Sequence, residues 1–195
     1  KDEREAVETI TELIEYYKGI FTILSSCAAR QLEEVTFRRN TIPVQELFDA
    51  AGKYFRKVTK NRTEKVELII EPMDAKVIGD VNQLRFLFEN LIDEALAVRE
   101  EGVIRLQARK DNEYIRFLFT DTRREKSVTE LNQLFYPNLA RMTSGEKGEL
   151  RGTEYLICKQ IIRDHDEFAG RRGCRINAEP AEGGGFTVYF TIPRR

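Results

Sequence analysis

VIGDVNQLRFLFENLIDEAL, residues 77–96, is the stretch that decides the fold. Apolar residues recur in it at intervals of three and four, which predicts a helix over about residues 81–99 with one buried side. Asp80 precedes this helix and is well placed to cap its N-terminus. Asn90 and Glu94 are four residues apart at the border of the apolar stripe, so they share one face. This polar pair is either a solvated shoulder or one wall of a polar pocket.

The segments on either side of this helix alternate between helical periodicity and strand patterns bounded by turn residues. The expected helices are Val44–Lys57, Thr129–Phe135 and Thr153–Asp164, and the expected strands are Val66–Ile70, Lys76–Gly79, Ile104–Arg109, Ile115–Thr120, Cys174–Ala178 and Phe186–Ile192. This order predicts an α+β fold, a two-layer α/β sandwich in which helices cover one face of one mostly antiparallel sheet.

Residues 1–38 form a separate pattern, that of one long helix with the heptad seam of a coiled coil or helical hairpin. Because so apolar a helix does not stay solvated alone, we expect it to pack against a second copy, as a homodimer, or against the following domain. Pro43 disfavours helical geometry at the residue before it. We therefore expect a helical dimerisation or linker segment at residues 1–38 and a second domain at residues 42–195.

The composition excludes several classes of protein. The net charge of the 195-residue chain is -1, with no block of like charge, so a nucleic-acid partner is not indicated. Cys27, Cys158 and Cys174 are far apart and odd in number, which argues against a disulfide framework and against a CxxC metal site. No apolar run approaches the roughly 18 residues of a membrane span. We expect no direct membrane contact in this segment and a cytoplasmic location, alone or as part of a larger membrane-bound sensor.

Four segments, in the same order, resemble motifs of one known family. They are residues 77–96, residues 117–122, residues 155–165 and the closing Gly184-Gly185 with residues 190–193. Together they resemble the ATP-binding domain of sensor histidine kinases, a fold shared with gyrase-type topoisomerases, heat-shock chaperones of the ninety-kilodalton class and mismatch-repair ATPases. The resemblance covers about residues 42–195, and the helix before it stands where such kinases keep their dimerisation helices.

The resemblance implies a site for ATP with Mg²⁺. Asp121 stands where the family's aspartate accepts the adenine amino group, and Thr122 follows it. Asn90 matches an asparagine that helps hold phosphate and metal, but Glu94 stands where a second, Mg²⁺-binding asparagine is expected. A carboxylate oxygen suits Mg²⁺, so Glu94 and Asn90 are the candidate metal ligands. The resemblance also implies a response regulator or a partner kinase as the protein partner.

The glycine-rich motifs of the family are altered. Arg123 replaces the glycine after the Asp-Thr pair, and only Gly152 remains of three glycines in the second motif. The arginines either pair with phosphates or fill the pocket by pairing with Glu94 and Asp121. Their opposite charges favour the second arrangement. The candidate cofactor-binding residues are Asn90, Glu94, Asp121, Thr122, Arg123, Arg124, Arg151, Gly152 and Lys159.

His165 is the only histidine, and it matches a structural histidine of the family. No phosphoacceptor histidine lies on the N-terminal helix, so no catalytic residue is assigned and autophosphorylation on histidine within this chain is excluded. We expect Asp164-His165-Asp166 to form a surface cap, not a metal site. Three functions stay open: a pseudokinase signalling module, an active but divergent ATP-dependent histidine kinase, and an interaction domain that uses the former nucleotide cleft.

Overall fold

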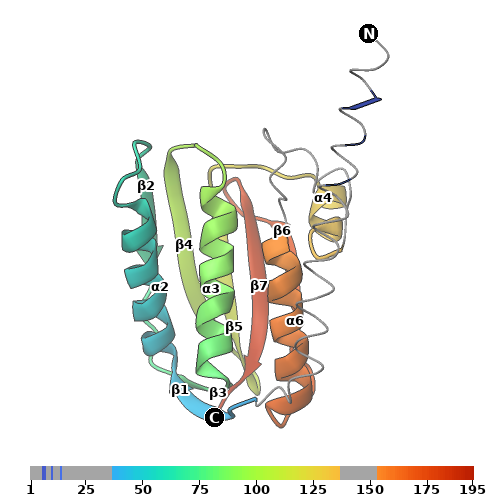
Figure 1. Ribbon diagram of the computed structural model, residues 1–195. Helices are drawn as coiled ribbons and strands as arrows, with labels where there is room; N and C mark the ends of the chain where they lie inside the picture. Colours follow the sequence, from blue (N-terminus) through green and yellow to red (C-terminus); the bar gives the residue numbers. More distant parts are fainter. Residues whose placement is uncertain (1–5, 8–9, 11–13, 15–36, 137–152) are drawn as a thin grey trace. The chain divides into compact units, whose positions relative to one another are not determined.

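The computed structural model describes residues 6–7, 10, 14, 37–136 and 153–195 (Figure 1). The chain divides into two compact units, Lys1–Thr36 with Tyr136–Thr153, and Phe37–Phe135 with Glu154–Arg195. Most of the predicted N-terminal helix and all of residues 137–152 lie outside the described residues, so the dimerisation helix stays a prediction. No helix among the described residues is long and apolar enough to span a membrane.

The second unit is built on a five-stranded sheet with the order β2-β4-β5-β7-β6. Its strands are β2 (Val66–Ile70), β4 (Gly102–Asp111), β5 (Tyr114–Asp121), β6 (Ile176–Pro180) and β7 (Phe186–Pro193). β2 runs parallel to β4, and the other neighbours are antiparallel. β1 (Asn40–Pro43) and β3 (Lys76–Gly79) form a separate antiparallel pair.

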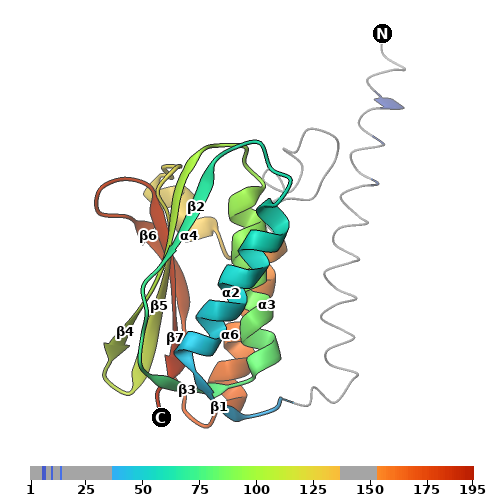
Figure 2. The same cartoon turned by 90° about the vertical axis from the view of Figure 1, so that its left-hand side faces the viewer.

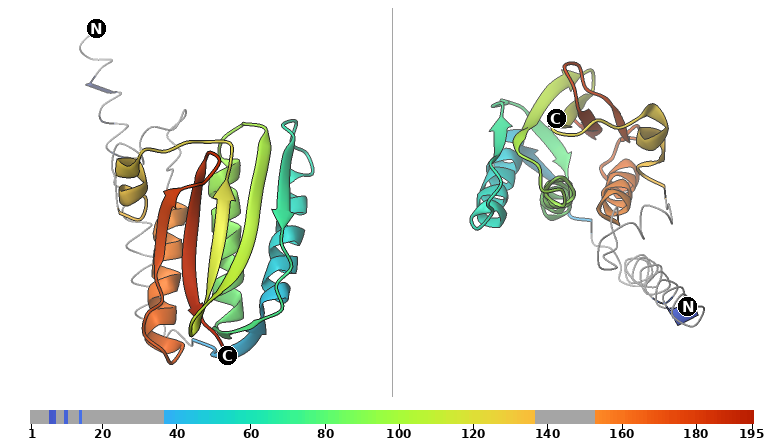
Figure 3. Two further views of the ribbon diagram at one scale, coloured as in Figure 1. Left: turned by 180° about the vertical axis from the view of Figure 1, so that it is seen from behind. Right: turned by 90° about the horizontal axis from the view of Figure 1, so that it is seen from above.

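Three long helices lie on one face of the sheet, as Figures 1 and 2 show. They are α2 (Val44–Thr59), α3 (Val81–Leu96) and α6 (Thr153–Phe168), and the short α4 (Val128–Gln133) lies near β6. No described helix covers the opposite face, which Figure 3 shows from behind. The two-layer α+β sandwich expected from the sequence is therefore confirmed.

Aromatic rings join the helical layer to the sheet. Phe117 of β5 and Phe190 of β7 stack with centroids 4.9 Å apart. Phe88 of α3 contacts both rings, and Phe48 of α2 meets Phe88 and Phe117 edge to face. All four side chains are among the largest fully buried ones. Aromatic pairs in such geometry add about 0.5–1.5 kcal/mol beyond the burial of their area.

Several element boundaries differ from the sequence expectations. Residues 40–43 were expected only to break a helix, yet they pair with β3, because Ile42 is buried while Pro43 closes the strand. α3 ends at Leu96 instead of about residue 99, and α6 continues to Phe168, beyond the predicted Asp164. β6 begins at Ile176, two residues later than expected.

Candidate functional site

Four of the candidate residues meet where α3 ends and the chain leaves β5, and they are Glu94, Asp121, Arg123 and Arg124. Asp121 is the last residue of β5 and lies opposite Ile104 of β4 in the register. This pairing turns the Asp121 side chain toward the helices, because Ile104 belongs to the buried core on that face. Asp121 is 1% exposed, so its carboxylate needs partners within the protein.

Arg123 supplies most of those partners. Its Nε donates to Asp121 Oδ1 at 2.8 Å and its Nη2 donates to Asp121 Oδ2 at 2.9 Å, a two-pronged pairing. The Arg123 backbone N–H also donates to Asp121 Oδ1 at 3.1 Å. Both side chains are 1% exposed. The pairing of Arg123 with Asp121 that their charges favoured is therefore present, and it is buried.

The Arg123 guanidinium also binds the end of α3. Nη2 donates to the Ala95 carbonyl at 2.6 Å, and Nη1 donates to the Glu100 carbonyl at 3.0 Å. A helix C-terminus leaves carbonyls without partners and carries partial negative charge, which a cation stabilises. Arg123 thus joins three parts of the chain: the end of β5, the end of α3 and the loop before β4.

Two glycines make room for this arrangement. A Cβ on Gly102 would lie 2.8 Å from Arg123 Cγ, and a Cβ on Gly185 would lie 2.1 Å from the Asp121 carbonyl oxygen. Both residues have positive φ, 135° and 81°, which a side chain would disfavour. These glycines therefore serve the contact between the strands and the Asp121 corner.

Two effects act in opposite directions on the pKa of Asp121. Burial raises the pKa, but the hydrogen bonds and charge of Arg123, with the charge of Arg124, lower it below its ordinary value. Arg124 lies with its Nη2 3.2 Å from Asp121 Oδ2 and its guanidinium over the Phe186 ring. Lys126 lies over the same ring at 5.5 Å. Asp121 is thus ionised and contacted by two arginines.

Glu94 meets a second carboxyl group that the sequence analysis did not single out. Glu154, in the first turn of α6, forms a side-chain hydrogen bond with Glu94. Burial, followed by the charge of Glu154, raises the pKa of Glu94 to about 7, although Arg124 and Lys126 oppose the shift. Such a bond between two carboxyl groups requires a proton on one of them. Glu154 stands two residues after Gly152, so its closeness to the glycine motif was the available signal.

Three other candidates, Asn90, Lys159 and Thr122, donate their side-chain hydrogen bonds to backbone carbonyls. The Asn90 Nδ2 donates to the Phe86 carbonyl at 2.7 Å, and Asn90 is 5% exposed. The Lys159 Nζ donates to the Phe135 carbonyl at 3.3 Å. Thr122 is exposed and donates its hydroxyl to the Val103 carbonyl at 2.7 Å. Arg151 and Gly152 lie outside the described residues.

The predicted metal ligands form no cluster in the described part of the chain. No group of three or more His, Cys, Asp or Glu side chains there could hold an ion. Asn90 and Glu94 lie on the same side of α3, but the Asn90 amide binds backbone and Glu94 binds Glu154. Their role as Mg²⁺ ligands stays a prediction.

His165 does not form the surface cap that was expected. It is fully buried, its Nε2 accepts from the Asp80 N–H at 3.1 Å, and its Nδ1 donates to the Ile161 carbonyl at 2.8 Å. Burial lowers its pKa, so the ring is neutral. The prediction failed because the flanking aspartates suggested a solvated helix end, whereas α6 continues past them to Phe168.

Comparisons with known proteins agree with this geometry. Residues 79–195 match the family described as histidine kinase-, DNA gyrase B- and HSP90-like ATPase. Comparison with curated protein sequences gives no significant match.

Similar solved structures include two histidine kinases and the protein ShkA. The mycobacterial sensor histidine kinase MprB is 18% identical, with a TM-score of 0.60, and the match covers 81% of this chain and 99% of that one. Histidine kinase ThkA in complex with response regulator protein TrrA is 18% identical, with a TM-score of 0.66 and coverages of 92% and 48%. Full-length ShkA in complex with AMPPNP is 13% identical, with a TM-score of 0.68 and coverages of 100% and 39%.

At these identities the solved structures establish the fold alone, and it is that of histidine kinase catalytic domains. The family match extends over more than half of the sequence, from the residue before Asp80 to the C-terminal Arg195. The chain therefore belongs to the histidine kinase-, DNA gyrase B- and HSP90-like ATPase family.

Proposed function

We propose that this chain is a signal-transduction module built on the ATP-binding domain of a sensor histidine kinase, in a pseudokinase form that binds ATP weakly or not at all. The observation that carries the proposal is the buried pairing of Arg123 with Asp121. An adenine amino group needs a free carboxylate oxygen at this corner. Arg123 and Arg124 engage both oxygens of Asp121, so the residues present do not fit the nucleotide.

Displacing Arg123 would be costly. Removing one partner from a buried ion pair typically costs about 3–5 kcal/mol. Arg123 would also give up its bonds to the Ala95 and Glu100 carbonyls. Each 1.4 kcal/mol corresponds to about a tenfold change in affinity, so ATP would bind at least about a hundredfold more weakly than to an open pocket.

The charges near the predicted phosphate and metal site support the same proposal. Glu94 and Glu154 place two carboxyl groups beside the end of α3, where a triphosphate would be repelled unless metal ions or protons compensate. Arg124 and Lys126 offset that charge from the other side. The charges around Glu94 are therefore offset by the protein's own side chains.

A module of this kind acts through its partners. One similar structure, ThkA, is complexed with a response regulator, and we propose a response regulator or a partner kinase for this chain as well.

We also propose a homodimer through residues 1–38. Light scattering on the chain with and without these residues tests the dimer, and a monomer in both cases would refute it.

Titration of the whole chain with ATP tests the pseudokinase proposal. We expect no rise in melting temperature at about millimolar ATP, with or without Mg²⁺, because a ligand stabilises only in proportion to its binding. Arg123→Gly restores the family's glycine and frees Asp121, so it should gain measurable ATP binding. Arg172→Gly, at a 73% exposed side chain, is the matched control.

The opposite result would identify an active kinase domain. A Mg²⁺-dependent rise in the melting temperature of the unmodified chain, abolished by Asp121→Asn, would refute the pseudokinase proposal. This readout does not depend on whether Arg123→Gly folds.

A further inference from the structure

The face of the sheet that no described helix covers contains a trough of about 510 Å³. β4 and β5 line one part of it, and β6 with the following hairpin turn lines the other. In Figure 2 the connection between β6 and β7 stands out from the sheet on the side away from the helices. The trough therefore has a raised wall, unlike a flat sheet surface.

Four residues cross the trough in one row. The strand register places Arg105 opposite Thr120, Thr120 opposite Thr187, and Thr187 opposite Glu179. Residues that are directly opposite each other point to the same face. Because neighbouring strands are about 4.8 Å apart, the Cα atoms of Arg105 and Glu179 lie about 14 Å apart. The row thus begins with a cation, ends with an anion and has two hydroxyls between them.

The two threonines form a buried polar floor. Their Oγ1 atoms are 2.7 Å apart and hydrogen-bonded, and the residues are only 9% and 6% exposed. Two hydroxyls use only one proton in bonding each other, so one O–H stays available to a ligand.

The walls carry four charges that lack partners. Arg105 and Arg109 lie on the β4 side, and Glu179 and Glu182 lie on the hairpin side. Within the described part of the chain none of the four forms an ion pair or a hydrogen bond through its side chain. Arg116 on the same face differs, since it pairs with Asp111 at 2.8 Å. The trough is therefore positive along one wall and negative along the other.

The hairpin wall is fixed in place. Ala181 N–H donates to the Gly185 carbonyl at 3.0 Å, and Gly184 N–H donates to the Ala181 carbonyl at 3.2 Å. Gly185 also approaches Asp121 too closely to admit a Cβ. Glu179 therefore extends from a paired strand and Glu182 from a hydrogen-bonded turn, and such preorganisation lowers the entropy cost of binding.

We propose that this trough binds a small zwitterion, a short peptide of two or three residues with free termini. Its carboxylate meets Arg105 and Arg109, its ammonium group meets Glu179 and Glu182, and its backbone lies over the threonine hydroxyls. A volume of about 510 Å³ falls in the range of small-molecule sites, about 300–1,000 Å³. Three extended residues span about 10 Å. With a hydrogen bond of about 3 Å at each end, that length matches the distance of about 14 Å across the row, because side chains stand roughly perpendicular to a sheet.

Trialanine is the probe. Titration of the whole isotope-labelled chain, followed by amide chemical shifts, should give shifts around Thr120 and Thr187 with a dissociation constant of about 1 mM at low salt. N-acetyltrialanine and trialanine amide each lack one charge, so each should bind about three to ten times more weakly. Added salt should weaken trialanine binding as well.

Matched variants assign the contacts. Arg105→Gln should weaken trialanine binding but leave the affinity for trialanine amide unchanged, and Glu179→Gln should leave that for N-acetyltrialanine unchanged. Lys57→Gln, on the helical layer, is the control and should leave the affinity for all three peptides unchanged. All three positions are exposed, so the fold is retained. The proposal is overturned if trialanine, at a concentration of about ten times the expected dissociation constant, shifts no amide signals around the trough. It is also overturned if trialanine blocked at both ends binds with the same affinity as trialanine.

This site lies on the face opposite the Asp121 carboxylate, because Arg105 and Thr120 alternate with Ile104 and Asp121 along their strands. The outcome of the ATP titration therefore does not decide the outcome here.

Discussion

The two ends of α3 are held by different chemistry. At the N-terminus, the Asp80 side chain accepts from the backbone N–H groups of Asn82, Gln83 and Arg38, while the neutral His165 ring accepts from the Asp80 N–H. At the C-terminus, two arginines bind the free carbonyls. Arg123 binds Ala95 and Glu100. The N-terminal end thus relies on a carboxylate cap and a neutral ring, and the C-terminal end relies on guanidinium groups.

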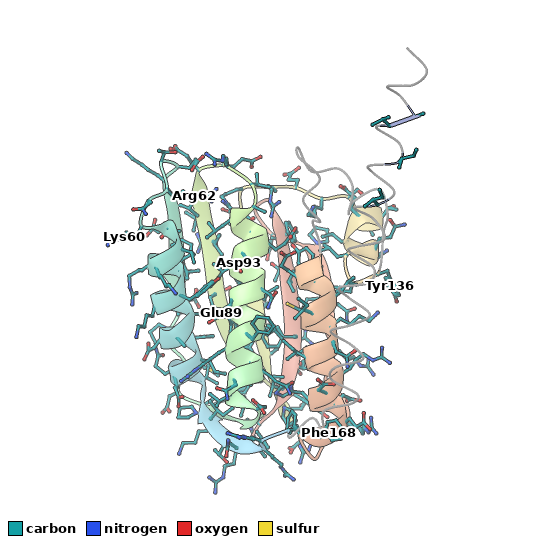
Figure 4. All side chains as sticks on the ribbon, viewed as in Figure 1. Lys60, Arg62, Glu89, Asp93, Tyr136 and Phe168 are labelled. Carbon is teal, nitrogen blue, oxygen red and sulfur yellow. The ribbon has the colours of Figure 1, made fainter. Side chains whose placement is uncertain are left out.

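Arg62 is the second arginine at the C-terminal end, as Figure 4 shows. Its guanidinium donates to the Leu96 carbonyl at 2.7 Å and to the Val98 carbonyl at 2.6 Å. The residues that we propose close the nucleotide site thus lie at the C-terminal end of this helix, and the buried His165 lies at the other. At the C-terminal end, Arg123 stands where the resemblance expects a glycine, and the Ala95 and Glu100 carbonyls accept its hydrogen bonds.

The largest expected effect is at the C-terminal end. Asp121→Ala leaves Arg123 buried without its carboxylate, so the free energy of unfolding should fall by about 3–5 kcal/mol, measured by urea denaturation. In the double variant Asp121→Ala, Arg123→Met the unpaired charge is gone, and much of the loss should be recovered. Equal losses in the single and double variants would contradict the ion-pair account.

The N-terminal end offers the next largest effect. His165→Ala removes a fully buried ring and leaves the Asp80 N–H and the Ile161 carbonyl without this partner. The expected loss is about 2–4 kcal/mol in the free energy of unfolding. Arg163→Ala, at an exposed position of the same helix, is the control and should change little. A loss below about 1 kcal/mol for His165→Ala would mean that the ring adds little to this end.

The ends should also respond oppositely to pH. The pKa of Glu94 is raised from 4.5 to about 7. The contribution of Glu94 to the free energy of unfolding is therefore fully present below pH 4.5 and is lost as the pH rises through about 7. The pKa of His165 is lowered, so its contribution is present above 6.5 and is lost as the pH falls.

Glu94→Gln separates these two responses. The variant should be about 1–3 kcal/mol more stable than the unmodified chain at about pH 8 and nearly equal to it at about pH 4. Urea midpoints at the two pH values measure this. If Glu94→Gln raises the free energy of unfolding by the same amount at both pH values, titration of Glu94 does not cause the difference in stability.

The smallest effect concerns the helix cap. Asp80→Ala should lower the free energy of unfolding by about 0.5–2 kcal/mol, because two N–H groups of the first turn lose their acceptor. Ser127→Ala, at the capping box of α4, gives a matched comparison for a shorter helix. A larger loss at Ser127 than at Asp80 would contradict the view that the α3 cap organises this end.

Local patterns predicted most of the fold and part of the site. Val66–Ile70 and Lys76–Gly79 form the strands expected from their sequence, because alternation and flanking turn residues are local signals. The parallel pairing of β2 with β4 was not predicted, since register between distant strands depends on contacts across the fold. Glu154 was missed for the same reason: it meets Glu94 only when α6 is placed beside α3.

The sequence by itself determined the helix that begins at residue 81, its Asp80 cap and the presence of opposite charges around Asp121 and Glu94, because periodicity, capping and charge are encoded within a few residues of one another. Only the tertiary structure decided how those charges combine. It buries Arg123 against Asp121, ties it to the end of α3, and buries His165 where the flanking aspartates suggested solvent. The physical reason is that a charge or a ring acquires its role from the groups that desolvate it, and those groups come from distant parts of the chain.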